Sequence, residues 1–240
     1  MKKAVLVFTA IAMVAVAFTG CSKKAGVKNT DKVFVLGLDD AFPPLGFRDE
    51  NNEIVGYDID LAKEVASRLG MEFVAQPIDW SQKEQELNTG KIDCIWNGLT
   101  ITAERFEAMA FTTPYLSNAQ VVVVKADSGI KTLADLAGKT VGVQATSSAQ
   151  DAIEEAVDFK NSLKEIVEFA ENITALNDLE INRIDGVVMD LVVANYSIAQ
   201  NNQNYIILEE TLAPENYGIA FKKDNTELRD KVQNALLEMV

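Results

Sequence analysis

Short apolar runs alternate with helix-patterned segments along most of this sequence, and this alternation limits the folds open to it. Val33–Leu38 and residues 121–124 are typical of buried strands, because each is a continuous apolar run of strand length. Residues 58–70 predict a helix with four apolar residues on one face and Gly70 as its stop. Alternating strands and helices predict an α/β fold with mainly parallel sheets.

The same patterns predict the remaining elements. Thr102 is placed to cap a helix, and Ser148 with Asp151 resembles a capping box. Further strands are expected at residues 73–75, 92–96, 140–143, 166–169, 186–189, 206–208 and 217–221. Further helices are expected at residues 81–87, 103–109, 132–137, 148–157, 174–184, 191–201 and 228–239.

Polar residues follow four of the expected strands directly. Asp39 and Asp40 follow the first strand, residues 97–98 follow the third, residues 144–148 follow the strand at 140–143, and Asp190 follows 186–189. Ligands of open α/β sheets bind beyond the carboxyl ends of the strands. These residues, from both halves of the chain, are therefore the first candidates for a binding site.

Composition excludes several classes of function. Histidine is absent, which excludes histidine general bases and the usual zinc sites. The formal net charge of −14 argues against a nucleic-acid partner, which needs a basic surface. We find no metal cluster and no cofactor motif. Cys94 lies in an apolar run and is expected to be a buried thiol.

The N-terminus has the pattern of an export signal. Two lysines precede an apolar stretch at residues 4–18, which is too short for a membrane span but suits a secretory signal. Thr19-Gly20-Cys21 resembles a bacterial lipobox, so residues 1–20 are expected to be a lipoprotein signal peptide, Cys21 the lipidated residue and 21–31 a tether. The alternative is plain secretion with an incidental Cys21.

Five motifs resemble the polar amino-acid-binding proteins of bacterial ABC importers, extracellular solute-binding protein family 3. They are GLDDAFPP at 37–44, VGYDIDLA at 55–62, GLTITAER at 98–105, VGVQ at 141–144 and YGIAF at 217–221. The resemblance implies the two-lobed periplasmic-binding-protein type II fold, with crossings near 115–119 and 213–217. It implies lobe 1 at 32–116, hinge and lobe 2 at 117–215, and a second lobe 1 segment at 216–240. Family members usually continue further, so this last segment is expected to be truncated.

The resemblance assigns a ligand-binding role to eight residues. Arg105, Thr100 and Ser148 would bind the α-carboxylate, and a guanidinium suits a planar carboxylate. Asp190 and the Gly98 carbonyl would bind the α-ammonium. The residues expected around the ligand side chain are Asp39, Phe42 and Trp80.

Simpler structural roles remain open for these residues. Arg105 could pair with Glu104 or Glu107 on a helix surface, and Asp190 could be the N-cap of the helix at 191–201. Phe42 and Trp80 could be core residues. Ser147 or Ser148 could act simply as a helix cap, a role that is compatible with binding.

The implied function is capture of a free L-amino acid by hinge closure and its delivery to a membrane permease with its ATPase. A polar ligand is favoured, basic first and glutamine second, since Asp39 between two rings suits a cationic or amide group. The protein is expected to be a monomer without catalytic residues, in the periplasm or at the outer face of the cytoplasmic membrane, anchored through Cys21. The alternatives are a ligand-sensing domain of a receptor and a dehydratase on the same fold.

Overall fold

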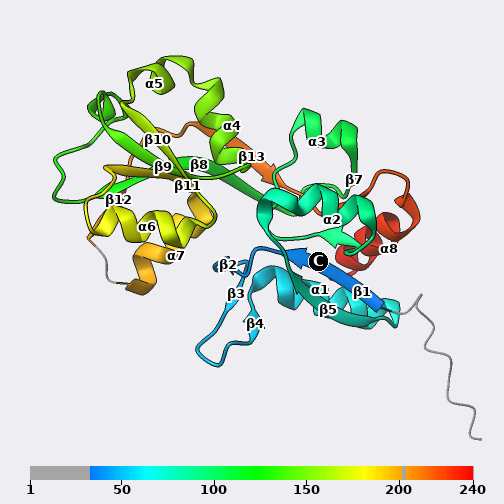
Figure 1. The fold of residues 1–240 in the computed structure, drawn as a ribbon. Helices are drawn as coiled ribbons and strands as arrows, with labels where there is room; N and C mark the ends of the chain where they lie inside the picture. The colour runs from blue at the N-terminus through cyan, green and yellow to red at the C-terminus, as the bar shows by residue number, and fades with distance from the viewer. Residues whose placement is uncertain (1–32, 202–203, 240) are drawn as a thin grey trace, which may run out of the picture. The chain divides into compact units, whose positions relative to one another are not determined.

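The computed structural model describes residues 33–201 and 204–239, which form two α/β lobes, each built on its own sheet (Figure 1). The predicted signal peptide at 1–20, Cys21 and the tether at 21–31 lie outside the described residues, as does Val240. Within the described ranges, no helix combines the length and the apolar character that a membrane crossing requires.

The first lobe is built on a five-stranded sheet in the order β5-β1-β6-β14-β7. β1 is parallel to both β5 and β6, whereas β14 is antiparallel to β6 and β7. The strands are β1 (Val33–Leu38), β5 (Glu72–Pro77), β6 (Cys94–Ile95), β7 (Met109–Phe111) and β14 (Ala220–Lys222). A separate three-stranded sheet contains β2 (Ala41–Phe42), β3 (Gly46–Arg48) and β4 (Ile54–Val55).

Two groups of helices pack on this sheet through separate apolar clusters. α1 (Tyr57–Leu69) and α8 (Thr226–Leu237) contact each other in one cluster with Phe34, Leu36 and Phe221. α1 ends at Gly70, whose φ of 66° is the left-handed conformation that glycine adopts without strain. The other cluster contains Leu87 of α2 (Lys83–Thr89). η2 (Trp80–Gln82) precedes α2, and α3 spans Ala103–Ala108.

The second lobe has a sheet in the order β10-β9-β11-β8-β12, with β13 also paired to β8. Figure 1 shows α4 and α5 on one side of this sheet and α6 and α7 on the other, in agreement with two separate apolar clusters. The strands are β8 (Leu116–Lys125), β9 (Thr140–Gln144), β10 (Glu165–Phe169), β11 (Gly186–Asp190), β12 (Tyr205–Ile207) and β13 (Ala213–Tyr217). The helices are η3 (Leu133–Leu136), α4 (Ser148–Glu155), α5 (Val157–Ser162), α6 (Asn172–Glu180) and α7 (Leu191–Asn201).

β8 and β13 are the two segments by which the chain passes between the sheets. They form an antiparallel ladder that runs from Ala213 opposite Gln120 to Tyr217 opposite Leu116. The ladder continues toward the first lobe, where Tyr115 N donates to Tyr217 O at 3.0 Å. The lobe limits at 116/117 and 215/216 stay a prediction.

The α/β, two-lobed fold class is confirmed, with differences in detail. The main sheet of each lobe is mixed: beside the parallel strands expected from the alternation, it contains antiparallel strands that adjoin the crossings between the lobes. The strand expected at 217–221 is divided into β13 and β14 around Gly218. A Cβ on Gly218 would lie 2.7 Å from Ile101 Cδ1, so the Ile101 side chain packs directly on the Gly218 backbone.

Two predicted helix details were wrong. The capping residue of α4 is Ser147 rather than Ser148: its side chain accepts a hydrogen bond from Gln150 N, and Asp151 takes no part. The helix expected at 148–157 is two helices, because Ala156 departs from helical geometry with φ −82° and ψ 66°. The cap predicted at Thr102 is confirmed.

Candidate functional site

One pocket at the carboxyl ends of the strands brings together all eight residues to which the resemblance assigned a ligand-binding role, whereas Asp40, another residue after the first strand, pairs with Arg48 instead. These eight residues come from both lobes: Asp39, Phe42, Trp80, Gly98, Thr100, Arg105, Ser148 and Asp190. Asn97, Gln144 and Ser147 also line the pocket. Four of the eight, Asp39, Gly98, Ser148 and Asp190, follow expected strands, in agreement with ligand binding at strand ends.

Arg105 supplies the positive charge of the pocket. It lies in the first turn of α3, where its backbone N–H donates to the Thr102 hydroxyl at 3.1 Å. Its side chain is only 7% exposed, and Nη1 donates to Thr100 O at 3.2 Å. Burial lowers the pKa of Arg105. Among the described residues no carboxylate forms an ion pair with it, so the alternative pairing with Glu104 or Glu107 is not formed.

Two hydroxyl groups from different lobes meet beside this cation. Thr100 and Ser148 are hydrogen-bonded through their side-chain oxygens at 2.9 Å. Ser148 is the first residue of α4, where backbone N–H groups have no partner within the helix. Ser147 supplies the cap, which leaves the Ser148 hydroxyl free to face Thr100. A guanidinium, two hydroxyls and a helix N-terminus together suit an anion.

Asp190 supplies negative charge at the end of β11. Its Oδ1 accepts hydrogen bonds from Asn118 Nδ2 and Gln120 Nε2, both at 2.9 Å, and from the Tyr217 hydroxyl. Burial, and then the negative charge of Glu215, raise the pKa of Asp190 to about 8. Its alternative role as a helix cap is not realised, because the Val192 N–H donates to Asn118 Oδ1 instead.

Glu215 is a residue of this region that sequence reasoning missed. It lies on β13 opposite Asn118 and is half-buried. Its carboxylate accepts from the Thr100 hydroxyl and from Gln120 Nε2, both at 2.9 Å, and also from Asn118 Nδ2. The alternating polar residues Asn118 and Gln120, which directly precede the apolar run at 121–124, are the signal that could have pointed here.

Asp39 also lines the pocket, and it contacts both lobes. Its Oδ2 accepts from Gln144 Nε2 at 2.7 Å, and its backbone N–H donates to Asn97 Oδ1 at 3.1 Å. Burial raises the pKa of Asp39 to about 6. Phe42 is buried in an apolar cluster and also lines the pocket, so its core packing is compatible with the predicted contact to a ligand.

Trp80 is half-buried, and a lysine lies against its ring. Lys83 Nζ is 5.1 Å from the ring centroid, and it donates to Trp80 O at 3.3 Å and to Thr146 O of the other lobe at 2.9 Å. Lys83 itself is 4% exposed, and burial lowers its pKa to about 8. Sequence reasoning gave Lys83 no role, since a lysine on a short helix has no local signal of burial.

Gly98 is held in place from behind the pocket. Its φ is +61°, and a Cβ there would lie 2.8 Å from side-chain atoms of both Leu45 and Phe42. Its backbone N–H donates to Asp58 Oδ2 at 3.0 Å, and the Tyr115 hydroxyl donates to the same oxygen at 2.9 Å. Burial raises the pKa of Asp58 to about 7. Asp58, another residue that sequence reasoning missed, thus positions the Gly98 backbone.

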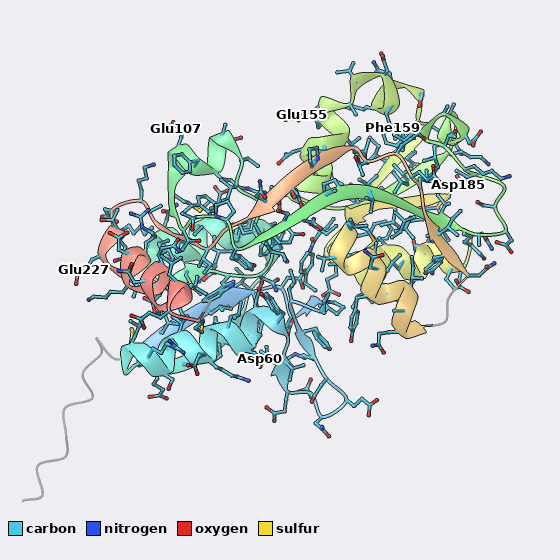
Figure 2. All side chains as sticks on the ribbon, turned by 180° about the vertical axis from the view of Figure 1, so that it is seen from behind. Asp60, Glu107, Glu155, Phe159, Asp185 and Glu227 are labelled. Carbon is cyan, nitrogen blue, oxygen red and sulfur yellow. The ribbon has the colours of Figure 1, made fainter. Side chains whose placement is uncertain are left out.

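Acidic side chains away from the pocket differ in their surroundings. Asp60, Glu107, Glu155 and Glu227 are exposed, and Figure 2 shows them at the outer surfaces of their helices. In the part of the chain that the structure describes, no group of three or more Asp, Glu, Cys and His residues is arranged to hold a metal ion. Unlike the exposed acids, Asp39 and Asp190 are buried and line the pocket.

Comparison with known proteins connects this geometry to a family. The sequence pattern of the bacterial extracellular solute-binding proteins, family 3, matches residues 34–240. The L-cystine-binding protein TcyJ of Escherichia coli (strain K12) is 28% identical over 243 residues, which cover 99% of this chain and 90% of that protein. The arginine-binding extracellular protein ArtP of Bacillus subtilis (strain 168) is 30% identical over 249 residues, covering 100% and 93%.

A solved structure agrees in fold with this chain. It is an ABC uptake transporter substrate-binding protein from Streptococcus pneumoniae with bound histidine. The two chains are 38% identical with a TM-score of 0.85, and the match covers 87% of each. The relatives are described as binding proteins, and the ligands in their descriptions differ: cystine, arginine and histidine.

Proposed function

Because the chain belongs to the bacterial extracellular solute-binding proteins, family 3, we propose that it captures a free polar L-amino acid and delivers it to the permease of an ABC transporter. One observation carries the proposal: a buried cation and two buried carboxylates line a single pocket. A zwitterion brings one charge of each sign, and burying either without a partner is costly. We propose that the pocket releases its ligand unchanged.

In this proposal Arg105 binds the α-carboxylate, together with the hydroxyls of Thr100 and Ser148. The support is that Arg105 is buried next to Thr100 with no carboxylate partner of its own among the described residues. Asp190 binds the α-ammonium, and the Gly98 carbonyl is its second acceptor. The two ends of the ligand backbone are thus held by groups of opposite charge.

A basic ligand side chain fits the remaining charge of the pocket. Asp39 and Asp190 are two acidic side chains in the pocket, against the single cationic side chain of Arg105. An amino acid with a cationic side chain has a net charge of +1, so it compensates this difference. Asp39 would bind the cationic group, and Phe42 and Trp80 would contact its flanks. Arginine and lysine are therefore the first candidates, and glutamine is the second.

Capture would proceed by closure of the two lobes. Bonds already join them at the pocket, between Thr100 and Ser148 and between Lys83 Nζ and Thr146 O. A ligand that bridges Arg105 and Asp190 favours the closed state, because only that state satisfies both of its charges. β8 and β13, which connect the sheets, would carry the hinge.

Titration calorimetry with arginine, lysine and glutamine tests the assignment. Arg105→Ala and Asp190→Ala should each weaken binding by about 30-fold to several-thousand-fold, the usual cost of truncating one partner of a desolvated pair. Asp39→Asn should weaken arginine and lysine far more than glutamine. Arg183→Ala, at a side chain that is 69% exposed, is the matched control and should bind normally. Near-normal affinity in the Arg105 and Asp190 variants would refute the site.

Location and anchoring complete the proposal. We place the mature protein in the periplasm or at the outer face of the cytoplasmic membrane, as a monomer held by lipid on Cys21. The lipobox-like sequence before Cys21 and the extracellular character of the family support this. Detergent partitioning of the wild type against Cys21→Ser checks the anchor: equal partitioning of the two into the aqueous phase would rule it out.

A further inference from the structure

Two carboxylates from different strands lie side by side: Asp190 lines the pocket, and Glu215 is next to it. Asn118 Nδ2 donates to both Asp190 Oδ1 and Glu215 Oε1, and Gln120 Nε2 donates to the same two oxygens. Because one NH₂ group reaches both oxygens, the two carboxylates are close neighbours. One is on β11 and the other is on β13, a strand that connects the lobes.

We propose that Glu215 determines specificity together with Asp190: the two form a carboxylate pair that shares one proton, and the α-ammonium of the ligand replaces that proton. The inference rests on the proposed function, since it concerns the same pocket. It adds a second acid for the ammonium and a proton that leaves when the ligand arrives. The ligand class is then restricted to amino acids with a free, positively charged α-amino group.

The hydrogen-bond donors around the pair are uncharged, whereas two ionised carboxylates need a positive charge nearby. The partners are neutral amides and hydroxyls from Asn118, Gln120, Tyr217 and Thr100. Among the described residues, no Lys or Arg side chain forms an ion pair with either acid. Arg105, on α3, is the cation that faces them, and its guanidinium is bonded to Thr100 O instead.

A proton on the pair relieves this imbalance. Two neighbouring carboxylates in a buried site cannot both ionise without a large cost, so one of them retains a proton. Burial and the charge of Glu215 raise the pKa of Asp190 to about 8, in agreement with a pair that is protonated near neutral pH. Tyr217, the other titratable group in contact, has its own pKa raised well above its usual value by burial.

An ammonium group supplies what the pair lacks. It brings a full positive charge and three N–H donors, so both carboxylates can ionise around it. The buried Oε1 of Gln120, which has no donor among the described residues, is a further acceptor beside the pair. As the ammonium binds, the shared proton passes to solvent, and the ligand keeps all its own protons. Below about pH 8 the proton competes with the ligand, so affinity rises with pH.

Calorimetry of arginine binding in buffers of different ionisation enthalpy measures the released proton. The wild type should release about one proton per ligand at pH 7, with affinity rising about ninefold from pH 6 to 7 and about fivefold from pH 7 to 8. Glu215→Gln should release less than half as much, show a much flatter pH profile, and bind about tenfold more weakly at pH 8.5. Glu209→Gln removes the same charge at an exposed position and should match the wild type.

A merely structural role of Glu215 would weaken binding without changing the proton count. Wild-type binding with no proton release, or the same release in Glu215→Gln, overturns the inference and leaves the proposed function standing. N-acetyl-arginine, which has no ammonium, should neither bind well nor release a proton. Tight binding of that compound also contradicts the pair.

A second measurement tests the pair without any ligand. The raised pKa of Asp190 means that its stabilising contribution is lost as pH rises from about 4 to about 8. Glu215→Gln removes the negative charge beside Asp190. The melting temperature of the variant minus that of the wild type should therefore be larger at pH 8.5, where Asp190 ionises, than at pH 5. Glu209→Gln should show no such difference. If arginine fails to bind the wild type, the proposed ligand is wrong, and this experiment still decides whether the pair exists.

Discussion

Arg105 and Asp190 are buried side chains whose charge no ion pair compensates among the described residues. A structural ion pair would have placed an opposite charge beside each of them. Their partners are instead neutral, as in the bonds from Gln120 to Asp190 and from Arg105 to Thr100 O. One pocket thus contains a buried basic side chain and a buried acidic side chain without ion-pair partners, and this favours a dipolar ligand.

The substitution Gly98→Ala tests whether this single position of the pocket requires glycine. Gly98 combines a positive φ with close approach of Leu45 and Phe42, so a methyl group adds clash to backbone strain. We expect a loss of about 2–3 kcal/mol in the free energy of unfolding, together with weaker ligand binding. Urea denaturation and calorimetry measure the two effects.

Gly70→Ala is the matched control for this change. Gly70 has φ +66°, but a Cβ there would have no atom within 4 Å. It should lose only about 1 kcal/mol and bind ligand normally. Equal losses at the two glycines would show that the packing around Gly98 is not what requires glycine.

At the scale of secondary-structure elements, short capped helices orient two of the pocket side chains. α3 has only six residues, and its first turn carries both the cap and Arg105. Such a helix is marginal by itself, so a cap that fixes its N-terminus also fixes the direction of Arg105. α4 is capped in the same way by Ser147, which orients Ser148 toward Thr100.

Thr102→Ala tests this coupling between cap and site. Loss of the cap should lower the free energy of unfolding by about 1 kcal/mol and also weaken ligand binding, because Arg105 loses its fixed position. Thr132→Ala removes a capping box from η3, outside the pocket. That control should show a comparable loss of stability with unchanged affinity. Equal affinity in both variants would mean that the cap does not position Arg105.

At the scale of the whole molecule, the two lobes are linked by bonds at the pocket and by the ladder of β8 with β13. Lys83 joins α2 to the loop before α4, and a tilted ring pair of Phe47 and Tyr196 joins β3 to α7. In the proposed closure, contacts of this kind between the lobes would exist only in the closed state and would contribute to the balance between open and closed states.

Lys83→Met tests the contribution of the bond to Thr146. Methionine preserves most of the buried volume but cannot donate, so closure should be less favoured and ligand dissociation about tenfold faster. Stopped-flow fluorescence of Trp80 and Trp96 measures the dissociation rate. Lys91→Met, at an exposed lysine that pairs with Glu86 in the same lobe, is the control and should leave the rate unchanged. An unchanged rate in Lys83→Met would assign closure to other contacts.

Much of this molecule follows from sequence patterns, because those patterns reflect local physics. Apolar periodicity and glycine stops located most of the helices and strands, and Thr102 capped α3 as expected. Asp39, directly after β1, and Asp190, at the end of β11, line one pocket, in agreement with ligand binding at the carboxyl ends of strands in open α/β sheets.

Tertiary structure alone decided the pairings between distant segments. Sequence patterns did not predict four of these contacts. They are β13 beside β8, Asp58 beneath Gly98, Lys83 against Thr146 and Glu215 beside Asp190. Each joins residues far apart in the chain, and it forms only when apolar packing, within a lobe or between the lobes, brings those segments together. Burial then sets the charges: the same acidic side chain is exposed on α1 at Asp60 and has a raised pKa in the pocket at Asp190.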